Sequence, residues 1–173
     1  MKEITVSSIG HSVTQNPIHK MTIKDPGSSI THFIGLIMAA LGTAPLLVRA
    51  SRHDSPIYMI SMAVFMASMI LLYAASTTYH TFDISPSVNK LLKKVDHMMI
   101  SVLIAGSYTP VCLLVLNGRL GLIILGIVWG LAITGILIKA FWIYCPKWFS
   151  SILYIGMGWT CILAFGPIVR SLT

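Results

Sequence analysis

The sequence Ser76-Thr-Thr-Tyr-His80, followed by Asp96-His97 and by Gly106-Ser-Tyr-Thr-Pro110, is the stretch on which the interpretation of this chain turns. It places a serine, two histidines and an aspartate at the facing ends of two very apolar segments. Ionisable groups are costly at membrane depth, so those on spanning helices are functional candidates. The stretch from 76 to 110 is therefore the first candidate for a functional site.

The composition is that of a membrane protein. Hydrophobic residues make up 55% and charged residues 10% of the 173 residues, and the mean hydropathy is +0.83. A soluble domain carries about 25% charged residues, so this chain could not cover a water-facing surface. The net charge of +7 comes from basic residues scattered between apolar runs. We therefore expect a lipid bilayer as the partner, and no nucleic acid.

Five apolar segments predict an all-α, polytopic transmembrane helix bundle, because about 20 residues are needed to cross a bilayer. The predicted helices span about 28–48, 57–80, 95–116, 120–139 and 149–170. They form a transmembrane domain over 25–173, which follows a polar tail over 1–24 without the features of a signal peptide. Cys112, Cys145 and Cys161 form no close pair, which favours buried free thiols.

Three local features predict how these helices begin, pack and bend. Asp25 and the Ser28-Ser29 pair are candidate N-caps of the first helix. The small residues Gly35, Ala39 and Gly42 recur every three to four positions, which lets another helix approach closely. Pro110 is expected to kink the third helix near Gly106, with Ser107 or Thr109 satisfying the freed carbonyl.

The basic residues predict the orientation of the chain. Of the 12 lysines and arginines, eight fall on the side of the N-terminus and four on the other side. The eight are Lys2, Lys20, Lys24, Lys90, Lys93, Lys94, Lys139 and Lys147, and the four are Arg49, Arg52, Arg119 and Arg170. The positive-inside rule then places the N-terminus in the cytoplasm. The same assignment brings His32, His80, Asp96 and His97 to the cytoplasmic ends of three helices.

Two interpretations of this cluster follow from spacing alone. Ser76 and His80 share one helix face at i, i+4, and Asp96 is expected to open the next helix. A histidine and a carboxylate could hold zinc and a water, with the serine orienting that water, which suits hydrolysis of an amide or ester. Alternatively, His80 bonds to Asp96 and clamps two helix ends. His97 lies about 100° around the helix from Asp96, towards a neighbour or the headgroups.

The same residues carry a family resemblance. Ser76-Thr-Thr-Tyr-His80, Asp96-His97 and Ile104-Ala-Gly-Ser-Tyr-Thr-Pro110 closely resemble the hemolysin III family, the bacterial branch of the progestin and adipoQ receptor superfamily. Ser29-Ile-Thr-His32-x-x-Gly35 and Tyr154-Ile-Gly-Met-Gly-Trp159 are similar to its first-helix and fifth-helix signatures. The resemblance covers about 25–170.

The resemblance implies a seven-helix bundle in the bacterial cytoplasmic membrane, with zinc near the cytoplasmic side. It implies that His80 binds zinc, that Asp96 holds a zinc-bound water and that Ser76 lies beside them. Alkaline ceramidases in the superfamily imply a lipid amide as the substrate. The bacterial branch is also described as cytolytic or pore-forming, which is the alternative function.

This sequence departs from the family at the remaining zinc ligands. The family supplies a His-x-x-x-His pair from its seventh helix, and these 173 residues contain no such pair. The family's first-helix Glu and Asn positions hold Asp25 and Ser28. We therefore expect a truncated member with five of seven helices, or a partner chain that supplies the missing ligands. His32 is a possible substitute ligand. The chain alone is expected to hold an incomplete zinc site and to be inactive.

Overall fold

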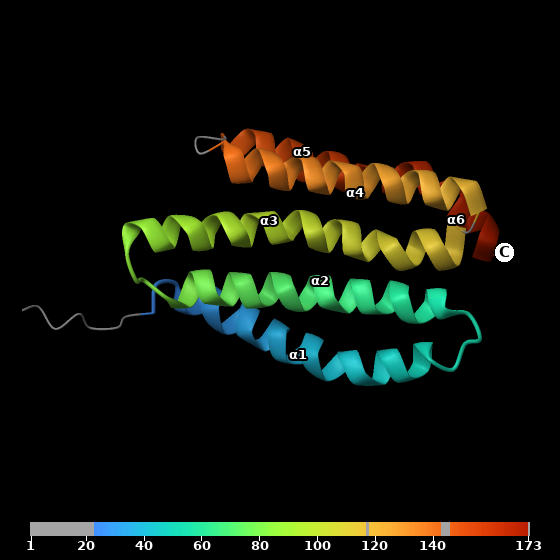
Figure 1. Ribbon diagram of the computed structural model, residues 1–173, viewed down its shortest axis with the longest axis horizontal. Helices are drawn as coiled ribbons and strands as arrows, with labels where there is room; N and C mark the ends of the chain where they lie inside the picture. The colour runs from blue at the N-terminus through green and yellow to red at the C-terminus, as the bar shows by residue number, and fades with distance from the viewer. Residues whose placement is uncertain (1–22, 117, 143–145, 173) are drawn as a thin grey trace, which may run out of the picture.

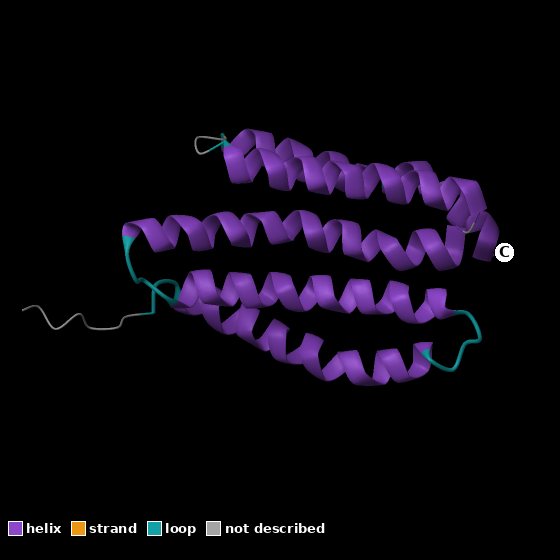
Figure 2. Cartoon of the chain, in the orientation of Figure 1, coloured by secondary structure: helices purple, strands orange, loops and turns teal. Residues whose placement is uncertain are grey.

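Figure 1 shows the computed structural model, which describes residues 23–116, 118–142 and 146–172 as a bundle of long helices. The elements are α1 (Pro26–Ala50), α2 (Pro56–Thr81), α3 (Pro86–Pro110), the π-helix η1 (Val111–Leu116), α4 (Gly118–Phe141), α5 (Lys147–Trp159) and α6 (Cys161–Leu172). Across these ranges every element is a helix and none is a strand (Figure 2). The predicted all-α class is confirmed.

Five helical stretches are long and apolar enough to cross a membrane. They are Pro26–Ala50, Pro56–Thr81, Pro86–Leu116, Gly118–Phe141 and Trp148–Gly166. The third joins α3 to η1, and the fifth runs from α5 into α6. The protein is therefore an integral membrane protein in a lipid bilayer, and the five predicted spans are confirmed. Of the predicted tail 1–24, only residues 23 and 24 are described.

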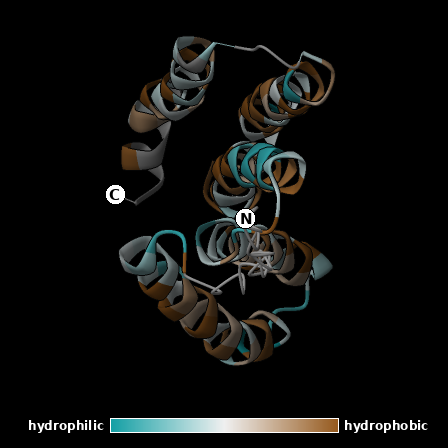
Figure 3. Cartoon of the chain, turned by 90° about the vertical axis from the view of Figure 1, so that its left-hand side faces the viewer, coloured by the Kyte–Doolittle hydropathy of each residue, from teal (hydrophilic) through white to brown (hydrophobic). Residues whose placement is uncertain are grey.

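The helices follow one another in an open arc, seen end-on in Figure 3, with α1 and α6 at its two ends. α1 packs on α2, α2 on α3, α3 on α4, and α5 on both α3 and α4. The buried apolar cluster lies in the α3–α6 half and consists of Ala105, Cys112, Ile124, Val128, Ala132, Met157 and Ala164. In the α1–α3 half, Ala39, Ala50 and Met66 are buried outside that cluster, and several serines are buried with them, among them Ser61, Ser68 and Ser76. The polar site therefore lies in the half without that apolar core.

The third helix begins at Pro86, so the predicted start near 95 was wrong. The side chain of Ser85 accepts a bond from the Val88 N–H at 3.3 Å and caps the helix. Pro86 then occupies the first turn, where its missing N–H costs nothing. The connector is only 82–85, and Asp96 lies about three turns inside α3 instead of opening it.

The small residues of α1 serve packing, as predicted. A Cβ atom on Gly35 would lie 2.7 Å from the Tyr73 ring, and one on Gly42 would lie 3.9 Å from Met66 Cε. Ala39 is buried between these positions. The α1–α2 approach therefore depends on Gly35 most of all, because it is the position with no room for a methyl group.

Pro110 changes the helix after it, whereas the predicted kink lay before it. α3 continues to Pro110 and passes into the π-helix η1. The carbonyl of Gly106 loses its backbone partner at Pro110, and neither of the two predicted hydroxyls donates to it. The Ser107 hydroxyl donates to Ile104 O at 2.8 Å, and the Thr109 hydroxyl donates to Ala105 O at 3.0 Å. A proline removes the i→i−4 bond, and a π-turn is one way in which a helix absorbs that loss.

The predicted fifth helix is divided at Thr160. Tyr108 Oη lies 3.1 Å from Met157 O and 2.9 Å from Gly158 O, and the Thr160 hydroxyl donates to Met157 O at 2.6 Å. Side chains thus bind carbonyls that an unbroken helix would use itself. Cys161, just after the break, is exposed, so its predicted burial was wrong; Cys112 is buried, and Cys145 lies outside the described residues.

Candidate functional site

The entry to α1 is bonded to the exit of α2. The backbone N–H of Asp25 donates to His80 O at 2.9 Å, and that of Lys24 donates to Thr81 O at 3.3 Å. The hydroxyls of Ser29 and Thr81 share a bond at 2.6 Å. The last carbonyls of a helix have no partner within it, so the chain before α1 satisfies those of α2. This fixes the two helix ends in register.

His80 is oriented by Asp25. Its Nδ1 lies 3.0 Å from Asp25 Oδ2. Asp25 is the N-cap residue of α1, as predicted, but its side chain makes no cap bond because the carboxylate turns to His80. The alternative caps, Ser28 and Ser29, lie in the first turn. When Nδ1 donates to a carboxylate, Nε2 keeps its lone pair, as in histidines that bind metals.

His32 and Ser76 form a second pair in the same place. His32 Nδ1 lies 2.6 Å from Ser76 Oγ, and Ser76 is only 3% exposed. The His32 ring meets the His80 ring edge-on with centroids 5.5 Å apart. The sequence had suggested His32 only as a substitute ligand. The structure brings it into direct contact with Ser76, and either group can be the donor of this bond.

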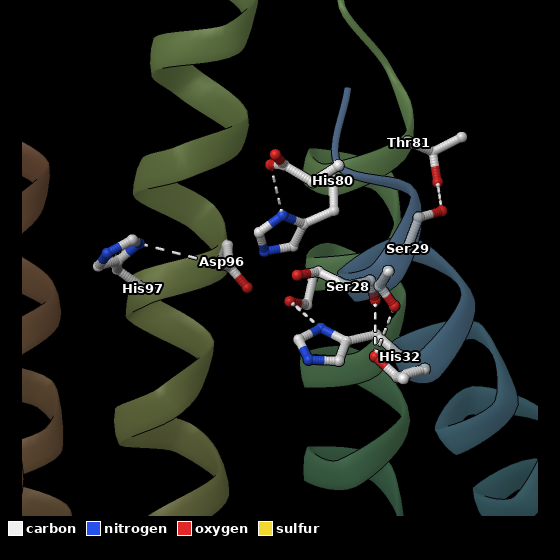
Figure 4. A network of polar contacts seen from close by, with 11 residues as sticks. Ser28, Ser29, His32, His80, Thr81, Asp96 and His97 are labelled. Atoms are coloured by element: carbon white, nitrogen blue, oxygen red, sulfur yellow. Dashed lines mark hydrogen bonds and ion pairs between the residues drawn. The ribbon is translucent and has the colours of Figure 1, made fainter. Parts of the chain in front are cut away.

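Asp96 completes this polar end of the bundle. Figure 4 shows its side chain and those of His32 and His80 pointing into one space between α1, α2 and α3. Asp96 is 7% exposed. His97 points to the other side of α3, where its Nδ1 lies 2.8 Å from Lys93 O and 3.6 Å from Asp96 Oδ2. The predicted His80–Asp96 clamp between the second and third helices is wrong, because His80 bonds to Asp25 and so joins α2 to the start of α1.

These donors do not form a complete zinc site by themselves. Within the ranges that the structure describes, no three His, Cys, Asp or Glu side chains lie close enough together to hold a metal ion. A catalytic zinc site needs three protein ligands and a structural one needs four. The oriented His80 and the buried Asp96 suit zinc chemically, but the described set is too small for it.

A buried lysine beside the site was missed by the sequence analysis. Lys139, which the sequence analysis used only as a topology signal at the end of the fourth predicted helix, is 8% exposed inside α4. Its Nζ donates to Tyr154 Oη at 2.8 Å, and Tyr154 Oη donates to His97 O at 2.5 Å. A lone lysine within an apolar helix was the available signal. This chain of bonds ties α4 and α5 to the turn of α3 that carries Asp96.

Comparisons with known proteins agree with these motifs. The family model described as Haemolysin-III related matches residues 21–173. The chain belongs to this family. It is 40% identical over 146 residues to Hemolysin-3 of Bacillus cereus, a match that covers 84% of this chain and 66% of that protein. It is 38% identical over 153 residues to a Hemolysin-3 homolog of Bacillus subtilis, covering 88% of this chain and 71% of the relative.

Proposed function

We propose that the polar end of α1–α3 is one half of the active site of a zinc-dependent membrane hydrolase that acts on a lipid amide or ester. The observation that carries the proposal is the Asp25–His80 bond, which orients an imidazole towards a space shared with Asp96 and the His32–Ser76 pair. A site at the ends of spanning helices suits a substrate delivered by the bilayer. The orientation proposed with it places this end in the cytoplasm, in keeping with its lysines.

Each residue has a role that follows from its contacts. His80 would supply one zinc ligand through Nε2, because Asp25 occupies Nδ1. Asp96 would accept a proton from a water, since it is a buried carboxylate facing the same space. Ser76, held by His32, would donate its hydroxyl to the developing oxyanion. The remaining zinc ligands would come from residues that this sequence does not contain.

The purified chain is expected to contain well under one zinc per molecule, because one imidazole and one nearby carboxylate are too few ligands. Metal analysis by mass spectrometry measures this directly. Co-expression with a segment that carries two further apolar helices and His-x-x-x-His is expected to raise the occupancy towards one, and His80→Ala is expected to prevent the rise. His53→Ala, at the other end of the bundle, is the matched control. Full occupancy in the chain alone, lost in His80→Ala, would contradict the half-site.

The name Hemolysin-3 of the Bacillus relatives suggests a second candidate function, membrane permeabilisation. The structure offers it little support, because the buried serines of α2 pack against other helices; Ser68, for example, lies directly against Gly106 of α3. Dye-loaded liposomes that contain the chain are therefore expected to release dye no faster than dye-loaded liposomes without protein. Leakage that persists unchanged in Ser76→Ala and Asp96→Ala would favour permeabilisation over hydrolysis.

A further inference from the structure

A cleft lies at the end of the bundle opposite the polar site. It has a volume of about 700 Å³ and is lined by Pro45, Val48, Arg49, Arg52 and His53. Clefts of about 300–1,000 Å³ are the usual size for a small ligand. Three of the five lining residues are basic or can become cationic, and none is acidic. We call it the Arg49–His53 cleft.

The basic wall of the cleft is held in place. Arg52 N–H donates to Arg49 O at 3.3 Å, and His53 N–H donates to Ala50 O at 3.2 Å, so the chain continues to turn after α1 ends. The His53 ring stacks on the Tyr58 ring of α2, with centroids 3.9 Å apart and planes 7° from parallel. Arg49 lies in the last turn of α1, and Arg52 and His53 lie in the turn that follows. That turn is hydrogen-bonded to α1 and stacked on Tyr58 of α2.

The other wall of the cleft is apolar and belongs to a spanning helix. Pro45 and Val48 lie in the last turns of α1, whose span ends at Ala50. The basic residues therefore lie at the depth of the headgroups, and the apolar ones lie just below, at the depth of the acyl chains. The order of the two walls matches that of a phospholipid molecule, with charge outside and hydrocarbon inside.

We propose that the Arg49–His53 cleft binds the headgroup phosphate of an anionic phospholipid, with an acyl chain lying along Pro45 and Val48. Guanidinium groups bind phosphate oxygens in pairs of parallel hydrogen bonds, which gives this contact its geometry. A zwitterionic lipid presents the same phosphate, but its ammonium group would meet the two arginines and be repelled. The site is independent of the proposed hydrolase half-site at the other membrane face.

The test is a lipid titration of the full purified chain in detergent, followed by native mass spectrometry. Phosphatidylglycerol is expected to bind about tenfold more tightly than phosphatidylcholine, and Arg49→Gln/Arg52→Gln is expected to abolish that preference. Arg119→Gln is the matched control, because it removes one arginine near the same membrane face but outside the cleft. Should the double variant fail to fold, Arg49→Gln and Arg52→Gln singly are each expected to reduce the preference about threefold.

Three results would overturn the proposal. The first is equal binding of the two lipids by the unaltered chain. The second is a loss of preference in Arg119→Gln as large as in Arg49→Gln, which would show a diffuse effect of charge. The third is displacement of phosphatidylglycerol by millimolar inorganic phosphate or by glycerophosphoglycerol, which carries the headgroup without acyl chains. Resistance to both competitors supports the apolar wall as part of the site.

Discussion

Replacing Gly106 by alanine is expected to lower the free energy of unfolding by about 2 kcal/mol, within the usual cost of overpacking a buried contact. A Cβ atom there would lie 2.6 Å from Ser68 Cβ and closer still to Ser68 Oγ. Ser68 cannot easily yield, because it is 2% exposed and its hydroxyl donates to Phe65 O at 2.7 Å. α2 and α3 would therefore have to separate, and with them the helices that carry His80 and Asp96.

Thermal unfolding in detergent micelles, followed by circular dichroism, measures the effect. Gly126→Ala is the matched control, since a Cβ atom there meets nothing within 4 Å and alanine is the better helix former. Ser68→Gly combined with Gly106→Ala should recover most of the loss, because it removes the atoms that collide. Equal stability of Gly106→Ala and Gly126→Ala would show that the α2–α3 contact is looser than the structure has it.

The spans could be predicted from sequence because each is a long apolar run, whose length and composition decide the outcome. The start of α3 could not be predicted from hydropathy, because Lys90, Lys93 and Lys94 make its first three turns look like a connector. The Ser85-Pro86 pair is a local cap signal for this start, which hydropathy does not contain. The break at Thr160 depends on Tyr108 from another helix, so no local pattern contains it.

The candidate site, too, was predictable from the sequence only in part. The spacing of Ser76 and His80, together with the charge count, was enough to expect both residues near His32 and Asp96 at one membrane face. Which side chain bonds to which depends on how each helix is rotated about its axis, and that is set by packing such as Gly35 against Tyr73. Asp25 reaches His80 because its backbone N–H is already bonded to His80 O. The roles of Ser76, His80 and Asp96 in catalysis and zinc binding stay predictions.

Tyr154→Phe is expected to destabilise the protein by about 3 kcal/mol, because it removes a hydrogen bond to a charged group, worth about 2 kcal/mol, and a neutral one, worth about 1 kcal/mol. The tyrosine hydroxyl accepts from the buried Lys139 ammonium and donates to His97 O. Phenylalanine fills the same space but can do neither. The loss should therefore come from the polar contacts and not from packing.

A double-mutant cycle with Lys139→Met separates the two contacts. Without the lysine, Tyr154→Phe no longer loses the bond to the ammonium but still loses the bond to His97 O, a neutral contact worth about 1 kcal/mol, so its cost is expected to fall by more than half. Tyr58→Phe is the control, because its hydroxyl has no hydrogen bond among the described residues and its ring stacking is kept. If Tyr154→Phe costs the same stability with and without Lys139, the bond between the Lys139 ammonium and the Tyr154 hydroxyl does not stabilise the protein. The cost that remains in the Lys139→Met background would report the bond to His97 O, which joins α5 to the turn of α3 that carries Asp96.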